Sequence, residues 1–190
     1  MGTGFATVYW LDASDHVVRV SDSWDTFALT NGGETCCWER VRGRPLWEFV
    51  SGDTTRMWLR TLLGHARMSR GEVERPYRCD SPDERRHMAM RIVSEEHGAV
   101  RVEHALLRSE PRDRPVHFEP HLRVGGASSR RCSICGRVGR GSRWSEPDAD
   151  ELRALPEPSG AIRVIYGVCE PCLRMLPDGR STPPTDRKRL

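Results

Sequence analysis

The chain has 190 residues, of which 37% are hydrophobic and 30% charged, with a formal net charge of +3. This is enough for one medium domain and a small second one. No window approaches the roughly 18 consecutive apolar residues of a membrane span, and residues 1–10 lack the basic and apolar regions of a secretory signal. We therefore expect a cytoplasmic location and no membrane association. Lys188 is the sole lysine among 30 basic residues, which is typical of a GC-rich bacterial genome.

The first half of the chain begins with two predicted strands, Thr7–Leu11 and Val17–Val20, because both are rich in β-branched and aromatic residues. A short helix is expected next, over residues 24–30. The glycine-containing triplet Asn31-Gly32-Gly33 would end it. Residues 34–50 contain the breakers glycine and proline, and we expect them to be irregular.

A long helix is predicted from Asp53 to about Gly71. Its apolar residues follow the i, i+3, i+4, i+7 spacing of a buried stripe: Leu59, Leu62, Leu63 and Ala66. Three further strands should follow, over Val73–Cys79, Arg86–Val93 and Val100–Leu107. Two strands, a helical middle and a three-stranded meander indicate an α+β domain: a five-stranded antiparallel sheet with helices on one face.

This order of elements resembles the PAS family of sensory domains over roughly residues 5–110. The segments that carry the likeness are Ser23-Trp24-Asp25-Thr26-Phe27-Ala28, in the place of the first short helix, and Val41-Arg42-Gly43-Arg44-Pro45-Leu46-Trp47. The resemblance implies a PAS-like sensor domain over residues 1–115. Such a domain would sense a ligand of unknown identity, or pair with a partner or a second copy of itself.

One histidine bears on the ligand question. Some PAS relatives hold haem through a histidine on the long helix, and His65 lies on the corresponding segment here. The resemblance therefore makes His65 a candidate haem ligand. The competing interpretation is a histidine at the edge of a packed face with its ring nitrogen hydrogen-bonded.

A domain boundary is predicted where the composition turns to proline, glycine and serine, between Pro111 and Arg131. We assign residues 116–131 to a flexible linker and residues 132–176 to a second, small unit. Residues 177–190, rich in proline and basic residues, are expected to form a disordered tail.

Two C-x-x-C pairs lie in the second unit, formed by Cys132 with Cys135 and by Cys169 with Cys172. Two such pairs supply the four thiolates that saturate a tetrahedral Zn²⁺ ion, which leaves no open position for a reacting water. The spacing predicts a structural zinc site in a zinc-ribbon-like module, with Zn–S distances of about 2.3 Å. A dithiol redox centre and an iron site of the same four ligands are the alternatives.

The remaining cysteines, Cys36, Cys37 and Cys79, lack this spacing, and we assign them no role.

A basic stretch surrounds the first cysteine pair. Between Pro120 and Ser145 there are six arginines and no acidic residue, and the arginines at or beyond the end of the linker are Arg130, Arg131, Arg137, Arg140 and Arg143. A nucleic acid is one partner that such a patch could bind. The small net charge and the acidic residues that follow favour a protein partner instead.

No enzyme is indicated. The sequence offers no nucleophile with a spaced base and no glycine loop for phosphate. We therefore expect a non-catalytic bacterial signal-transduction or regulatory protein, in which the zinc module serves protein interaction. The rival hypothesis is a DNA- or RNA-binding transcriptional regulator that acts through the basic zinc module.

Overall fold

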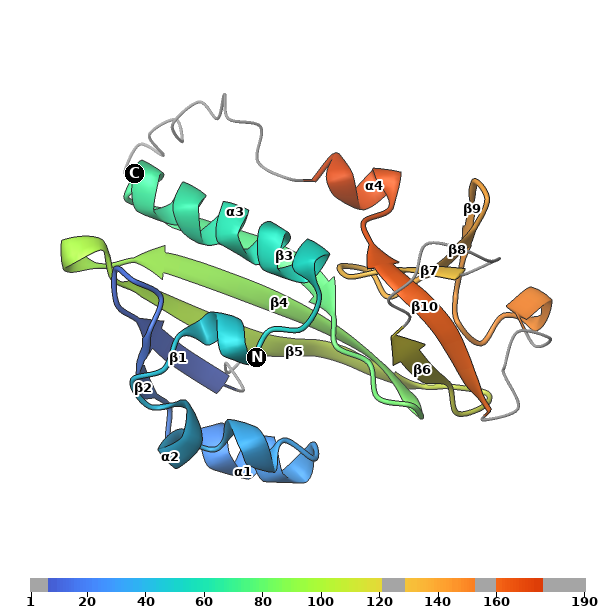
Figure 1. Cartoon of the computed structure of the whole chain (residues 1–190), viewed down its shortest axis with the longest axis horizontal. Helices are drawn as coiled ribbons and strands as arrows, with labels where there is room; N and C mark the ends of the chain where they lie inside the picture. Colours follow the sequence, from blue (N-terminus) through green and yellow to red (C-terminus); the bar gives the residue numbers. More distant parts are fainter. Residues whose placement is uncertain (1–6, 121–128, 153–159, 176–190) are drawn as a thin grey trace, which may run out of the picture.

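The computed structural model describes residues 7–120, 129–152 and 160–175. In these residues the strands form two five-stranded sheets, and Figure 1 shows the second sheet beyond one end of the first. The longest helix lies along the first sheet. The chain is thus an α+β protein, as the sequence predicts.

The first sheet consists of a hairpin and a meander. The hairpin strands are β1 (Thr7–Leu11) and β2 (Val17–Val20), and the meander strands are β3 (Glu72–Arg78), β4 (Glu84–Ser94) and β5 (Val100–Pro111). Because β5 pairs with β1, the order is β2-β1-β5-β4-β3, and all four pairings are antiparallel. The five predicted strands are confirmed. The strands β4 and β5 extend beyond their predicted ends, most of all β5, which runs four residues past Leu107, whereas β3 both begins and ends one residue earlier than predicted.

The helices between the two parts of this sheet are α1 (Trp24–Thr30), α2 (Trp38–Val41) and α3 (Asp53–Ser69), with 3₁₀ turns at Glu34–Cys36, Leu46–Glu48 and, after β4, Glu96–Gly98. The predicted stripe of α3 is confirmed, since Leu59, Leu62, Leu63 and Ala66 are all buried. Trp24 of α1 packs edge-on against Tyr9, and Trp58 of α3 packs against Tyr77. Tyr9 and Tyr77 both contact the ring of His104 on β5, so α1 and α3 cover the same face of the sheet.

The second sheet is mixed and has the order β6-β10-β7-β8-β9. Its strands are β6 (His117–Pro120), β7 (Ser129–Cys132), β8 (Val138–Arg140), β9 (Arg143–Ser145) and β10 (Ala161–Gly167). The central strand β10 is parallel to both β6 and β7, whereas β8 pairs antiparallel with β7 and β9. A 3₁₀ turn (Asp150–Leu152) precedes β10, and the short helix α4 (Glu170–Leu173) follows it.

The sequence prediction of a linker over residues 116–131 is wrong at its two ends, which are strands of this second sheet. The physical reason is burial: Val116 and the partly buried Phe118 pack with Ile162 and Val164 of β10 in a small core of their own. Sequence composition gives no sign of this pairing, because the strand partner β10 lies more than 30 residues away from both ends. Residues 121–128, and the predicted tail from residue 177, lie outside the described residues.

The second sheet packs against the first. Ile134 and the cysteines Cys132, Cys169 and Cys172 belong to the same buried cluster as the core of the first sheet. At the start of α3, the Thr54 hydroxyl donates to the Tyr166 carbonyl oxygen of β10 at 3.3 Å. The division into two domains near residue 115 stays a prediction. If it holds, the contacts described here lie in the interface between the two domains.

A buried group of ion pairs crosses the same junction. Arg112, just after β5, pairs with Asp80 at 2.6 Å and with Asp148 at 3.5 Å, and the three side chains are at most 2% exposed. Arg78 of β3 also binds Asp80, at 2.7 Å, and Arg85 of β4 binds Asp148. Asp148 lies between β9 and β10, whereas Arg78 and Arg85 belong to the first sheet and Arg112 follows its strand β5. The network therefore joins the two sheets.

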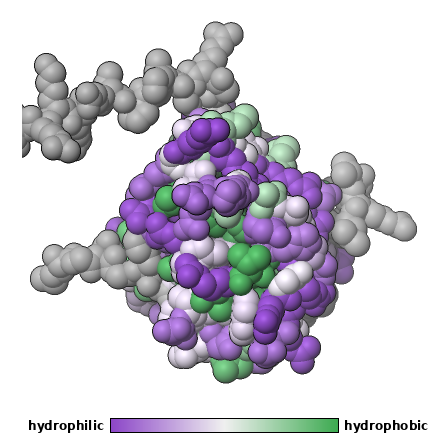
Figure 2. All heavy atoms as spheres, turned by 90° about the vertical axis from the view of Figure 1, so that its left-hand side faces the viewer, coloured by the Kyte–Doolittle hydropathy of each residue, from purple (hydrophilic) through white to green (hydrophobic). Residues whose placement is uncertain are grey.

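On the face that Figure 2 shows, hydrophilic residues dominate and hydrophobic ones form small groups between them. Among the described residues, no helix is both long enough and apolar enough to cross a bilayer.

Candidate functional site

The four cysteines predicted to bind metal come together at one end of the second sheet. Cys132 is the last residue of β7, and Cys135 lies in the tight turn that leads to β8. Cys169 precedes α4, and Cys172 lies within it. The turn is closed by the Gly136 N–H, which donates to the Cys132 carbonyl at 3.0 Å, and Gly136 adopts a positive φ of 72° that favours glycine.

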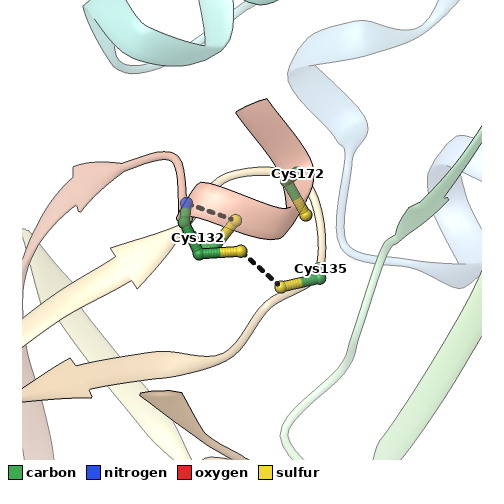
Figure 3. Close-up of side chains that lie close together, drawn as sticks. Cys132, Cys135 and Cys172 are labelled. Carbon is green, nitrogen blue, oxygen red and sulfur yellow. Dashed lines mark hydrogen bonds between the residues drawn. The ribbon is translucent and has the colours of Figure 1, made fainter. Parts of the chain in front are cut away.

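The geometry of this cluster fits a four-coordinate metal ion. The four Sγ atoms all lie within 4.8 Å of one another, and Cys132, Cys169 and Cys172 are buried. The Cys135 and Cys169 sulfurs are 3.7 Å apart. A tetrahedron with metal–sulfur bonds of about 2.3 Å has sulfur–sulfur edges of about 3.8 Å. Figure 3 shows the sulfurs of Cys132, Cys135 and Cys172 directed toward a common point, so the four residues could hold one metal ion.

The charge state of the cluster also favours a cation. Hydrogen bonds from the Cys135 and Cys172 thiols lower the pKa of Cys132, and backbone N–H groups add to this effect. The same hydrogen bond to Cys132 raises the pKa of Cys135 to about 12. The pKa of Cys172 is raised for the same reason. One thiolate thus suppresses the ionisation of its neighbours, and a bound dication is what allows all four thiols to ionise together.

Backbone hydrogen bonds fix the ligand positions. The Cys169 N–H donates to the Cys132 sulfur at 3.4 Å, which links the two C-x-x-C pairs. The Arg78 N–H of β3 donates to the Ile134 carbonyl oxygen at 2.8 Å, inside the first pair. A Cβ atom at Gly136 would lie 3.0 Å from an oxygen of Asp80. The first cysteine turn is therefore held against the first sheet and its buried ion pairs.

The predicted basic patch lies on the strands beside this cluster, and several of its arginines have partners. Arg137 pairs with Glu146 at 3.4 Å, and Arg143 with Glu151 at 3.2 Å. The guanidinium groups of Arg130 and Arg131 lie over the rings of Trp144 and Phe118, respectively. Arg140 is exposed at the end of β8. The acidic residues after β9 thus neutralise part of the patch.

A separate feature is a cavity of about 490 Å³ on the helix-covered face of the first sheet. Its wall includes four aromatic side chains, those of Tyr9, Trp24, Phe27 and Tyr77. His104 lines it from β5, whereas the haem candidate His65, partly buried on α3, is not among its lining residues. Two cysteines without an assigned role, Cys36 and Cys79, also line it.

Sequence reasoning missed His104 as a site residue. The sequence does carry a signal for this residue. Alternate side chains of β5 point to the same face of the sheet, and His104 therefore shares a face with Val100, Val102 and Leu106. Val100 and Val102 are fully buried, but Leu106 is 46% exposed. His104 therefore lies where the buried part of the strand gives way to the cavity.

His104 is neutral at physiological pH. Its Nδ1 atom lies 2.8 Å from the Tyr77 hydroxyl, and its ring stacks on Tyr9 with the centroids 5.6 Å apart. Burial lowers the pKa of His104 to about 4. Burial also raises the pKa of Tyr9 and Tyr77, so all three rings are uncharged near neutral pH.

This environment gives a testable pH dependence of stability. The folded pKa of about 4 lies below the unfolded value of about 6.5. The unfolded chain therefore binds the proton first, and stability falls as the pH drops below about 6.5. Between pH 7.5 and 5.5 the loss from this group should be about 1 kcal/mol.

Urea unfolding at both pH values, with His104→Gln as the control, measures this loss. The variant should lose about 1 kcal/mol less than the wild type. Equal losses in the two proteins would show that His104 is protonated as easily in the folded state as in the unfolded one.

Comparisons with protein-family models, with curated proteins and with solved structures gave no match for this chain.

Proposed function

We propose that the chain is a non-catalytic regulatory protein of bacterial signal transduction, in which a PAS-like sensor half is joined to a structural zinc module. The single observation that carries the proposal is the closed four-cysteine cluster, packed against the sheet that also holds a cavity. A site with four protein ligands and no open position stabilises a fold and catalyses nothing. The module would then present a surface for a protein partner.

We infer zinc as the metal, because four thiolates saturate a tetrahedral Zn²⁺ ion. A dithiol redox centre needs only two cysteines, so the gathering of four sulfurs in one cluster supports metal binding over the redox alternative. Iron in the same four-thiolate site is the alternative, and metal analysis of the purified protein distinguishes iron from zinc.

The PAS-like assignment is supported by the arrangement of residues 7–111. The hairpin, the helical middle and the meander occur in the order of the PAS resemblance, and β1 and β5 lie side by side in the sheet. The helices α1 and α3 cover one face, and the cavity lies there. We propose that this half senses a ligand or pairs with a partner, including a second copy of the chain.

Native mass spectrometry of the protein purified under reducing conditions tests the proposal. The expected result is one zinc ion for each chain, with dimers or partner complexes that retain it. A chain that carries no metal, or an iron ion in place of zinc, would contradict the zinc module. A reproducible chemical turnover that depends on the four cysteines would contradict the non-catalytic role.

The second candidate is a DNA- or RNA-binding regulator, supported by the exposed Arg130, Arg140 and Arg143 on neighbouring strands. The pairing of Arg143 with Glu151 argues against it. Binding to a mixed-sequence duplex over a salt series separates the two. A nucleic-acid binder should lose about tenfold or more of its affinity between 50 and 200 mM salt, and a protein-binding module should show little affinity to lose.

A further inference from the structure

The cavity on the first sheet has the size of a small-molecule site. Its volume of about 490 Å³ falls within the range of roughly 300–1,000 Å³ that ligand sites occupy. Its walls come from β1, β3, β4, β5, α1 and the turn after α1, so segments up to 100 residues apart in sequence enclose it. It is distinct from the cysteine cluster, none of whose four residues lines it.

The chemistry of the wall selects an apolar, aromatic occupant. Tyr9 and Trp24 meet edge to face with their centroids 5.7 Å apart, and Tyr77 meets His104 in the same way at 5.7 Å. Aromatic rings arranged at right angles offer both faces and edges to an inserted ring. Ala28, Met88 and Leu106 complete the apolar part of the wall.

The polar groups of the wall select a neutral occupant. Arg86 is the charged side chain among the described lining residues, and its guanidinium already donates to the Cys79 carbonyl oxygen at 2.8 Å and to the Asn31 side-chain oxygen. No carboxylate lies among the described residues of the wall. A cationic ligand would find no counter-charge in this wall. An anionic ligand would meet Arg86 alone, two of whose N–H groups already donate to the oxygens of Cys79 and Asn31, and it would lose its water in an otherwise apolar site, which is costly.

His104 offers a polar position for specificity. Tyr77 engages Nδ1 of His104, which leaves Nε2 as the nitrogen that this ring can offer to the cavity. We propose that the cavity binds a neutral, planar aromatic molecule with one hydrogen-bonding group, which meets Nε2 of His104. This proposal rests on the proposed sensor role of the first half and names the ligand class of that role.

Fluorescent probes of matched shape test the ligand class. N-phenyl-1-naphthylamine is neutral, and 1-anilinonaphthalene-8-sulfonate adds a negative charge to the same ring system. We expect saturable one-to-one binding of the neutral probe and at least tenfold weaker binding of the sulfonate. Equal affinities, or no saturable binding of the neutral probe, would overturn the proposal.

Variants of α1 locate the probe. Ala28→Phe places a ring in the cavity and should abolish binding of the neutral probe, because the added side chain fills the space. Leu29→Phe is the matched control, since Leu29 is 56% exposed and is not among the lining residues, and it should bind as the wild type does. Binding unaffected by Ala28→Phe would place the probe elsewhere and refute the cavity.

Competition against the bound neutral probe tests the polar position. 1-Naphthol and 1-methylnaphthalene differ by a hydroxyl in place of a methyl group, and naphthol should compete about fivefold more strongly, as one hydrogen bond predicts. The preference should vanish in His104→Phe. Equal competition by the two compounds in the wild type would refute the role of Nε2 whether or not that variant folds.

The zinc content of each sample is measured alongside. If the wild-type protein retains zinc and its partner complexes but does not bind the neutral probe, the proposed ligand class is refuted and the proposed function is not. If the wild-type protein binds the probe but contains no zinc or forms no complex, the proposed regulatory function is refuted and the ligand class is not.

Discussion

Replacing Cys169 by serine should release the metal and unfold the second sheet while the first sheet stays folded. The serine hydroxyl is a poor zinc ligand, and the remaining three thiols cannot close the tetrahedron. The second sheet has only a small core of its own, built on Val116, Ile162 and Val164. The binding free energy of a structural zinc ion, on the order of 10 kcal/mol, therefore supplies much of its stability.

Zinc analysis and hydrogen exchange by mass spectrometry measure the two effects. The metal content should fall from one equivalent to near zero. Protection should be lost over residues 129–152 and 160–175. It should persist in β4 and β5, whose core includes the fully buried Ile92 and Val102.

The chain offers matched controls for this experiment. Serine at Cys36, Cys37 or Cys79 makes the same change in residues that lie outside the cluster, and the metal content should not change. One equivalent of zinc retained after Cys169→Ser, with the second sheet still protected, would refute the assignment of the four ligands. Metal-free wild-type protein, isolated under reducing conditions, would do the same and favour the redox alternative.

Replacing Arg112 by methionine should destabilise the protein by about 3–5 kcal/mol, because it leaves Asp80 and Asp148 buried without their shared cation. The Arg112 side chain is 1% exposed and contacts both carboxylates. Arg78 and Arg85 remain as single partners of Asp80 and Asp148, which places the expected loss at the lower end of this range. Since Asp148 lies in the segment between β9 and β10 of the second sheet, the variant should also loosen the junction between the sheets.

Urea unfolding of the zinc-loaded protein measures the loss, with Arg163→Met as the control. Arg163 and Glu119 form an ion pair at 3.4 Å in which each side chain is 50% exposed. Exposed pairs contribute about 0–1 kcal/mol, so the control should unfold nearly as the wild type does. Equal stabilities of the two variants would show that the buried network contributes no more than a surface pair.

Local sequence determined most of the first sheet. The stripe of Leu59, Leu62, Leu63 and Ala66 defined α3, because periodicity and the residues that end a helix act within a few turns of chain. The strands were marked by β-branched residues and by the turns between them. The four metal-binding candidates were found from spacing alone, since a C-x-x-C pair places both sulfurs on one ion within a single turn.

Tertiary structure decided what depends on distant parts of the chain. Composition alone predicts a linker where β6 and most of β7 lie, because their parallel partner β10 is 30 or more residues further on. The ion pairs of Arg112 needed Asp80 and Asp148, which lie 32 and 36 residues away. His104 became a cavity residue because β1, β3 and α1 bring Tyr9, Tyr77 and Trp24 to one place. Local sequence patterns specify individual helices and strands. The burial of a side chain depends on which distant element packs over it, and a local pattern contains no information about that element.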